Sequence, residues 1–390
     1  MKKLIGYILG GFFFISCTTT EVVNPAEYET FSRLYGNINN QYGVRVLEAE
    51  DGGFYILGYG SFINEDIPSQ DILLIKTNKT GVVTEQWNYD FGGQEEARFF
   101  DWNQAQDGFV IVGMNEPGKL IVFEVDTNGE KRAEFTDISS DGHEPNHVHT
   151  SSSGYFITGS LNSNVFVYQL NANLELVQDF EFGSVSPLPN IVRSGIRTFE
   201  LNGTLVSVFQ VSTSNVSSIS FNIPNLSTGL FDFQMELSSD LEPTVSCGTS
   251  QNQGLYLGGH TQDDIYLANT RPLQRTLQAE YQLSTTSIER IKSITLSADG
   301  SSLYVTGRRR NGNDQTILLI KLNASSGAII WEKEFGGVQE VLANEVETKE
   351  VGVDVIATQD GGVALLSNTL FERNTMIGLV KLDANGEFKN

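Results

Sequence analysis

Short apolar runs separated by glycine-containing turns recur along most of the chain. The run Phe54–Gly58 follows the turn Asp51-Gly52-Gly53, and a second apolar run, Asp71–Lys76, comes after a polar loop. Apolar runs of this length, bounded by turn residues, predict β-strands. No stretch of about ten residues carries a convincing helical periodicity. The pattern therefore predicts an all-β protein.

The same unit is repeated along the chain. Each copy contains a turn glycine followed by an apolar strand, and these glycines are Gly53, Gly108, Gly154, Gly203, Gly254, Gly300 and Gly362. A repeat of about 50 residues that holds several short strands is typical of the blades of a β-propeller.

Each unit is expected to contain four strands. The third strand leads into a hairpin turn such as Asp126-Thr127-Asn128-Gly129, and the fourth ends in an aromatic residue and glycine, as in Trp87–Gly92 and Trp331–Gly336. Glycine supplies the positive φ that such turns need. The Asp-x-Asn-Gly segments resemble half of a calcium loop, but they lack its downstream ligands, so we interpret them as turns.

The last unit lacks its fourth strand, because the chain ends soon after the turn at Asp383–Gly386. Phe31–Gly36, near the other end of the chain, has the spacing of the missing strand. Residues 28–390 are therefore predicted to form a seven-bladed β-propeller closed by an N-terminal strand. Six or eight blades are the alternatives, since the fourth unit (about 187–240) is the most degenerate.

The repeat resembles a family of bacterial secreted and lipid-anchored propellers that is common in Bacteroidota. Units of that family read Asp-Gly-Gly-aromatic, then Asp-aliphatic-Lys-Leu-Asp-x-Asn-Gly, then Trp-x-x-x-aromatic-Gly-Gly. The resemblance covers roughly residues 28–390 and is clearest in the first and sixth units and at the end of the seventh. It implies the fold and a location at the cell surface. Because members are mostly without assigned activity, it implies no catalytic residues.

The N-terminus has the features of an export signal. A short basic segment is followed by the apolar run Leu4–Ile15 and by Ser16-Cys17. The run is too short to span a bilayer and predicts a signal peptide over residues 1–16. Phe14–Cys17 resembles the bacterial lipobox, which implies a lipidated (palmitate-bearing) Cys17 and a tether over residues 17–27. An ordinary secretory signal with an incidental cysteine is the alternative.

Charge and cysteine content limit the class of partner. The chain has 25 basic and 48 acidic residues, a net charge of −23, which argues against nucleic acid or an anionic membrane surface. Two cysteines exclude a disulfide framework, and Cys247 is expected to be a buried structural residue. We expect a monomer that contacts the outer membrane of the cell envelope only through its lipid, from the periplasm or the surface. No cofactor or metal is predicted.

The loops that join consecutive units share one face with the loops between second and third strands. Propellers usually bind ligands on this face. We place here a set of charged and histidine residues as the candidate ligand-binding site: Glu95, Glu96, Arg98, His143, Glu144, His147, His260, Glu289, Arg290, Arg308, Arg309 and Arg310. The carboxylates either cap loop N–H groups or bind a cation or sugar. The arginines, placed in the loop after the second strand of unit six, either pair with internal glutamates or bind an anionic ligand.

The segment His143–His147 matches the zinc-protease motif H-E-x-x-H. That chemistry requires a helix, which Pro145 opposes, and a third ligand at the usual spacing is missing. These features disfavour a protease. A zinc site formed by His143, His147 and His149 and ordinary channel-lining histidines are the remaining interpretations.

These observations favour a binding or scaffold module over an enzyme. The expected partner is a polysaccharide or an envelope protein, bound through its polar groups. The sequence carries no nucleophile motif and no phosphate loop. A glycan-active hydrolase or lyase that uses carboxylates at the channel mouth is the alternative function.

Overall fold

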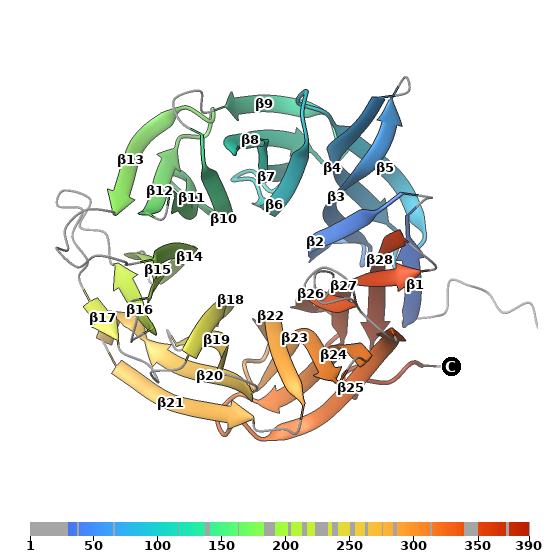
Figure 1. Ribbon diagram of the computed structural model, residues 1–390, viewed down its shortest axis with the longest axis vertical. Helices are drawn as coiled ribbons and strands as arrows, with labels where there is room; N and C mark the ends of the chain where they lie inside the picture. The colour runs from blue at the N-terminus through green and yellow to red at the C-terminus, as the bar shows by residue number, and fades with distance from the viewer. Residues whose placement is uncertain are drawn as a thin grey trace, which may run out of the picture.

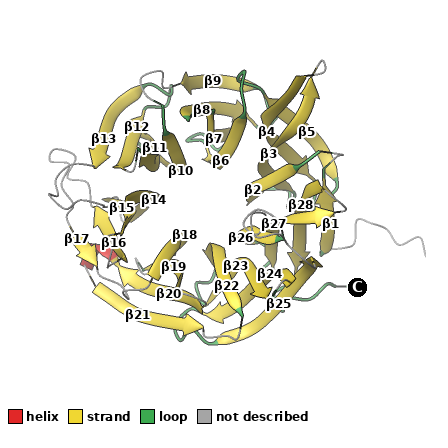
Figure 2. Cartoon of the chain, viewed as in Figure 1, coloured by secondary structure: helices red, strands yellow, loops and turns green. Residues whose placement is uncertain are grey.

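The computed structural model is a disc of antiparallel strands arranged around a central axis (Figure 1), and strands make up nearly all of its regular structure (Figure 2). The structure describes residues 30–36, 39–64, 67–116, 118–136, 141–162, 164–182, 192–201, 204–212, 217–222, 233–235, 241–249, 254–261, 264–274, 276–283, 287–312, 314–338, 350–371 and 374–389.

Within these residues the strands pair into seven four-stranded sheets. The first sheet holds β2 (Gln41–Glu48), β3 (Phe54–Asn64), β4 (Ile67–Thr77) and β5 (Val83–Tyr89). The second holds β6 (Glu95–Trp102), β7 (Gly108–Asn115), β8 (Lys119–Asp126) and β9 (Lys131–Thr136). The third holds β10 (His143–Ser151), β11 (Gly154–Leu161), β12 (Asn164–Leu170) and β13 (Leu176–Phe182).

The fourth sheet holds β14 (Val192–Leu201), β15 (Thr204–Ser212), β16 (Ser217–Asn222) and β17 (Phe233–Met235). The fifth holds β18 (Leu241–Thr249), β19 (Leu255–Thr261), β20 (Asp264–Arg271) and β21 (Thr276–Leu283), with the short 3-10 helix η2 (Pro272–Gln274) between the last two. The sixth holds β22 (Ile288–Leu296), β23 (Ser302–Asn311), β24 (Asp314–Asn323) and β25 (Ile329–Val338). The seventh holds β26 (Val351–Ala357), β27 (Val363–Phe371), β28 (Asn374–Leu382) and β1 (Phe31–Tyr35).

The first strand of the chain completes the last sheet. β1 runs antiparallel to β28, with Phe31 opposite Lys381 and Tyr35 opposite Ile377. Phe31 also packs edge-on against Phe54 of the first sheet, with 6.0 Å between ring centroids. The expected closure by an N-terminal strand and the all-β propeller fold are therefore confirmed. The Asp-x-Asn-Gly segments are turns as predicted: Asp126 accepts hydrogen bonds from the Asn128 and Glu130 N–H groups.

The first strand of every sheet contains an extra residue at a corresponding position, and β18 has a second register shift between Val245 and Gly248. In β6, Ala97 lies opposite Gly113 and Phe99 lies opposite Val112, so Arg98 has no residue opposite it. The same β-bulge occurs in the other first strands, and the extra residues are Val44, Arg98, Asn146, Ile196, Thr244, Lys292 and Val353. A bulge exchanges the two faces of a strand. In a regular strand, two residues an even number of positions apart are on the same face. When the bulge lies between them, they are on opposite faces and point to different neighbouring sheets.

The core is a series of apolar layers between adjacent sheets. One layer joins Leu57 and Ile72 of the first sheet to Phe100 and Ile111 of the second. Another joins Ile56 of the first sheet to residues of the last sheet. Each sheet thus buries its apolar faces against its two neighbours, as repeat architectures require.

The N-terminal predictions concern residues that the structure does not describe. Cys17, the signal peptide and most of the tether lie outside the described residues, as does the Cys247 side chain, although its backbone belongs to β18. Within the described residues, no helix has both the length and the apolar character needed to cross a bilayer.

Closure by β1 predicts a large difference between two substitutions in that strand. Phe31 is 6% exposed, so Phe31→Ala should lower the free energy of unfolding by about 3–5 kcal/mol. Leu34 is 45% exposed, so Leu34→Ala should change it by less than about 0.5 kcal/mol. Urea unfolding of both variants measures the difference, and equal stabilities would show that β1 does not close the ring.

Candidate functional site

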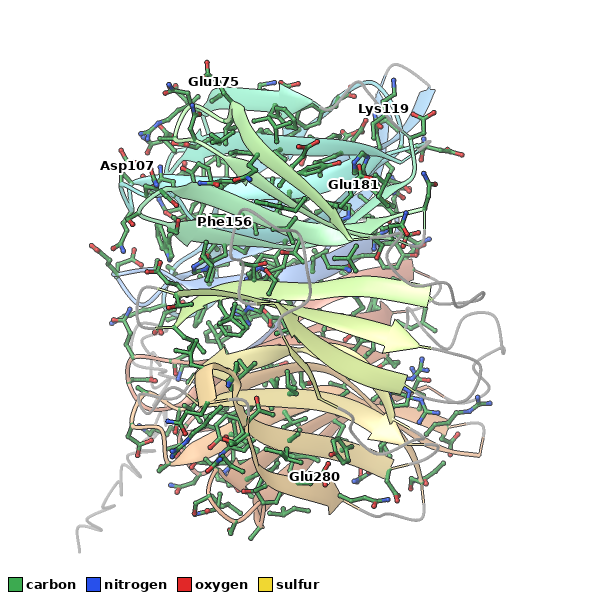
Figure 3. The ribbon with its side chains drawn as sticks, turned by 90° about the vertical axis from the view of Figure 1, so that its left-hand side faces the viewer. Asp107, Lys119, Phe156, Glu175, Glu181 and Glu280 are labelled. Carbon is green, nitrogen blue, oxygen red and sulfur yellow. The ribbon has the colours of Figure 1, made fainter. Side chains whose placement is uncertain are left out.

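The candidate residues lie where first strands begin and second strands end. They occupy the starts of β6, β10 and β22 and the ends of β19 and β23, which antiparallel pairing brings together. We call this side of the disc the leading face, and the side that carries the turns between first and second strands the hairpin face. In Figure 3, which shows the disc from its edge, Lys119 marks the leading face and Asp107 the hairpin face.

Several of these residues lie in strands and not in loops. Arg308, Arg309 and Arg310 were expected in the loop after the second strand, but they belong to β23. The reason is that β23 continues to pair on both sides, with β22 and with β24, as far as this charged run. Glu95 and His143, expected in loops between units, are the first residues of β6 and β10.

Arg309 is held by carboxylates inside the sixth sheet. Its Nε donates to Glu289 Oε1 at 2.6 Å, and its Nη1 donates to Glu332 and to Glu334. Glu289 is fully buried and Arg309 is 9% exposed. Hydrogen bonds to Glu332, Glu334 and Glu289 raise the pKa of the Arg309 guanidinium. Arg309 therefore serves the internal role that we considered as an alternative for the arginines.

Three other arginines share the opposite face of the sixth sheet. Arg290 lies directly opposite Arg308, and Arg310 follows two residues later on the same face of β23. Arg290 Nη1 donates to the carbonyl of Glu289, and Arg310 Nε donates to the carbonyl of Gly312, both at 2.8 Å. Neither Arg290 nor Arg310 forms an ion pair with a described residue. We call Arg290, Arg308 and Arg310 the arginine cluster.

The acidic candidates differ in exposure. Glu96 and Arg98 form a half-exposed ion pair, with 2.7 Å between Oε2 and Nη2, and Glu144 is exposed. Glu95 is fully buried and points to the first sheet. Burial, together with the negative charges of Asp90 and Asp71, raises the pKa of Glu95 to about 7.

The bulge at Asn146 separates the two histidines of the H-E-x-x-H segment. His143 lies before it, and its Nε2 is 2.9 Å from the Tyr168 hydroxyl. His147 lies after it on the opposite face and packs against Phe99, with the rings tilted by 50° and 4.2 Å between their centroids. The segment is a strand and its histidines do not converge, so the described residues support neither the protease nor the histidine zinc site.

Two more histidines complete this set. His149 shares a strand face with His147; burial lowers the pKa of both groups, with Arg197 contributing, and brings that of His149 to about 4. His260 is 4% exposed at the end of β19, opposite Glu242. His147 and His260 are therefore shielded from solvent, whereas His149 is half-buried.

Sequence reasoning missed a ring of contacts around the axis. Six of the seven residues that follow a bulge have described side chains, and each of the six interacts with another of them. We call these residues the axial ring: Arg45, Phe99, His147, Arg197, Ser293 and Asp354. The Arg45 guanidinium lies 3.9 Å from the centroid of Phe99, and Ser293 donates to Asp354 at 2.7 Å. Asp354 also accepts from the Val46 N–H at 3.0 Å, which joins the last sheet to the first.

A polar pocket lies on the hairpin face, away from the predicted residues. It has a volume of about 320 Å³ and opens between the fifth and sixth sheets. Tyr256, Asn269, Arg271, Ser301 and Asn323 are among its lining residues. Its residues belong to turns and strand ends of two units, so no sequence motif marks it.

Comparisons with known proteins show the fold. No protein-family model and no curated protein sequence matches the chain. The chain is similar to the solved structure of the Dos1 propeller, with a TM-score of 0.53 and 9% identity over 90% of this chain and 96% of that one. It is also similar to a putative 6-phosphogluconolactonase from Bacteroides uniformis, with a TM-score of 0.53 and 13% identity over 90% and 95% of the two chains.

A third similar structure is Raptor from Chaetomium thermophilum, with a TM-score of 0.54 and 7% identity over 90% of this chain and 30% of that one. At these identities the similarity supports the fold alone. The protein is a β-propeller, a fold that commonly serves as a binding or scaffold module.

The different surroundings of two adjacent arginines lead to a stability prediction. Arg309→Ser leaves Glu289 buried without its cation, so the free energy of unfolding should fall by about 3–5 kcal/mol. Arg310→Ser, the same change on the other face of β23, should change it by less than about 1 kcal/mol. Urea unfolding compares the two, and similar losses would contradict the buried ion pair.

Proposed function

We propose that this protein is a binding module that holds a ligand with acidic groups on its leading face. The observation that carries the proposal is the arginine cluster. Like charges directly opposite each other in a β-ladder are destabilising, and Arg290 and Arg308 stand in that relation. Guanidinium groups bind carboxylates through paired hydrogen bonds, so three of them on one face of the sheet offer a site for an acidic group.

The charge of the whole chain narrows the class of ligand. A net charge of −23 repels polyanions at long range, so a densely charged polymer is a poor partner. A polysaccharide with isolated acidic sugars, or an envelope protein that presents a few carboxylates, avoids this repulsion. Either would lie across the leading face and place an acidic group against the arginine cluster.

The location of the protein is part of the proposal and rests on the sequence. The signal peptide and Cys17 would anchor the chain by lipid in the outer membrane, and the tether would connect the anchor to the disc. The hydrolase or lyase alternative gains no support, because Glu95 and Glu289 are fully buried and do not face a bound glycan.

A binding assay with matched variants tests the proposal. The protein is screened against an array of neutral, uronic-acid-containing and sulfated oligosaccharides and against envelope proteins. The best ligand is then titrated into Arg290→Gln with Arg308→Gln. Affinity should fall at least about tenfold, because each charged hydrogen bond contributes roughly 1.5–3 kcal/mol.

The control is Lys131→Gln with Arg132→Gln, which removes the same charge from exposed residues of β9 on the hairpin face. This control should bind as the unmodified protein does. Equal affinity of the two double variants would move the ligand away from the arginine cluster, and binding only to neutral ligands would contradict the proposed ligand class.

A further inference from the structure

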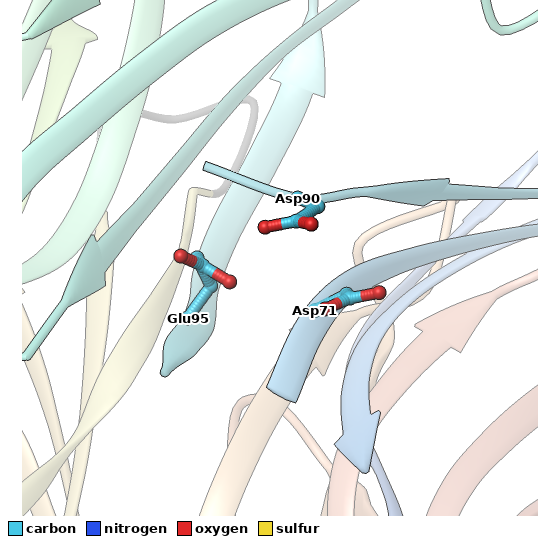
Figure 4. A group of neighbouring side chains, drawn as sticks. All are labelled: Asp71, Asp90 and Glu95. Atoms are coloured by element: carbon cyan, nitrogen blue, oxygen red, sulfur yellow. The ribbon is translucent and has the colours of Figure 1, made fainter. Parts of the chain in front are cut away.

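Three carboxylates meet on the leading face between the first and second sheets. Asp71 belongs to β4, Asp90 follows the end of β5, and Glu95 is the first residue of β6 (Figure 4). One carboxylate oxygen of each lies within 4.8 Å of the others. Opposite oxygens around a bound Ca²⁺ are about 4.6–5.2 Å apart, since each is at 2.3–2.6 Å from the ion. The three groups are thus close enough to share one cation.

Glu95 gives an independent indication that a ligand is missing from this group. Its side chain is fully buried, and neither carboxylate oxygen accepts a hydrogen bond of normal geometry from a described residue, although the nearby N–H groups of Gly93 and of Glu95 itself favour its charged form. A buried carboxylate without a donor or a cation is strongly unfavourable. The Glu95 side chain points toward Asp71 and Asp90, whose negative charges do not compensate it.

The sixth sheet shows how the same position is built without a cation. Gln70 and Gln315 occupy corresponding positions. Gln70 donates to the carbonyl of Glu95 and Gln315 donates to the carbonyl of Glu350, and each of these acids lies three positions before a bulge. The residue after Gln70 is Asp71, whereas the residue after Gln315 is Thr316, whose hydroxyl donates to Glu334 at 2.7 Å.

The corresponding acids of the sixth and seventh sheets have donors. Arg309 donates to Glu334 at 2.6 Å, and the Leu370 N–H donates to Glu350 at 2.9 Å. Between the first and second sheets, a carboxylate replaces the threonine hydroxyl, and Glu95 receives no such donor. At this position of the repeat, the acids of the sixth and seventh sheets are therefore stabilised by donors of the protein, whereas the acids between the first and second sheets need a cation.

An amide side chain lies opposite Glu95 in the sheet. Asn115 is opposite Glu95 in the pairing of β6 with β7, so the two side chains share a face. Its Oδ1 is buried and has no hydrogen-bond partner among the described residues. Both side chains also lie beside Gly93. Asp90 is exposed and gives the ion a path from solvent.

We propose that Asp71, Asp90 and Glu95, with Asn115 Oδ1 as a further ligand, form a calcium site that joins the first and second sheets. A donor set made only of oxygens selects hard cations. Three carboxylates from separate elements suit the flexible coordination of Ca²⁺, because Mg²⁺ is usually bound through one or two carboxylates and several waters. The site is distinct from the arginine cluster, which lies on the sixth sheet.

Calorimetric titration of CaCl₂ and MgCl₂ into the full-length protein, at neutral pH and 0.15 M KCl, tests the proposal. We expect one Ca²⁺ per chain, bound more tightly than Mg²⁺, and a Tm that rises with Ca²⁺ concentration. Glu95→Gln and Asp71→Thr, which copies the residue of the sixth sheet, should each weaken Ca²⁺ binding at least about tenfold. Glu95→Gln should also raise the Tm in a chelator, because it removes a buried charge.

The matched control is Glu350→Gln, which changes the corresponding residue in the seventh sheet and should leave Ca²⁺ binding unchanged. Absence of saturable binding at millimolar CaCl₂ would overturn the proposal. Equal Ca²⁺ affinity of the unmodified protein and Glu95→Gln would overturn it too, as general attraction to an acidic surface would then explain the binding. Tighter binding of Mg²⁺ would overturn the choice of ion.

Discussion

The β-bulge in each first strand determines where the polar side chains of the leading face point. Three residues before the bulge, Glu95, Glu289 and Glu350 are directed into the interface with the preceding sheet and are buried there. The residue just after the bulge points to the next sheet instead, which produces the axial ring. A regular strand would place both positions on one face. The extra residue therefore separates the buried acids from the residues around the axis.

The ring of sheets also depends on contact between its first and last members. A four-stranded sheet with two apolar faces is stable only between neighbours, so the first and last sheets must meet. Two contacts accomplish this. β1 joins the last sheet and packs Phe31 against Phe54, and Asp354 bonds to the Val46 N–H at the axis. The packing of Phe31 is at the periphery of the disc and the Asp354 hydrogen bond is at its axis, so the two contacts stabilise both edges of the same interface.

The sequence predicts the repeat, the strands, the turns and the closing strand, because glycine spacing and alternating hydrophobicity report backbone conformation directly. It fails for the polar ends of strands. Arg309 and Arg310 are neighbours of one type, yet one is buried and the other is on the surface, since strand alternation assigns them to opposite faces. Asp71 resembled an ordinary strand residue, because only the folded ring brings it to Glu95. The bulges leave no periodic signal, so the separation of His143 from His147 was not predictable either.

The bulge is also the feature whose role a single residue can test. Arg98→Ala keeps the extra residue of β6 and removes an ion pair between half-exposed groups, so its stability should be within about 1 kcal/mol of the unmodified protein. Insertion of one alanine between Arg98 and Phe99 would instead exchange the faces of the preceding residues and direct Arg98 and Glu96 into the interface with the first sheet. Urea unfolding should then show a loss of about 3 kcal/mol or more. Equal stability of the insertion variant and Arg98→Ala would contradict the account.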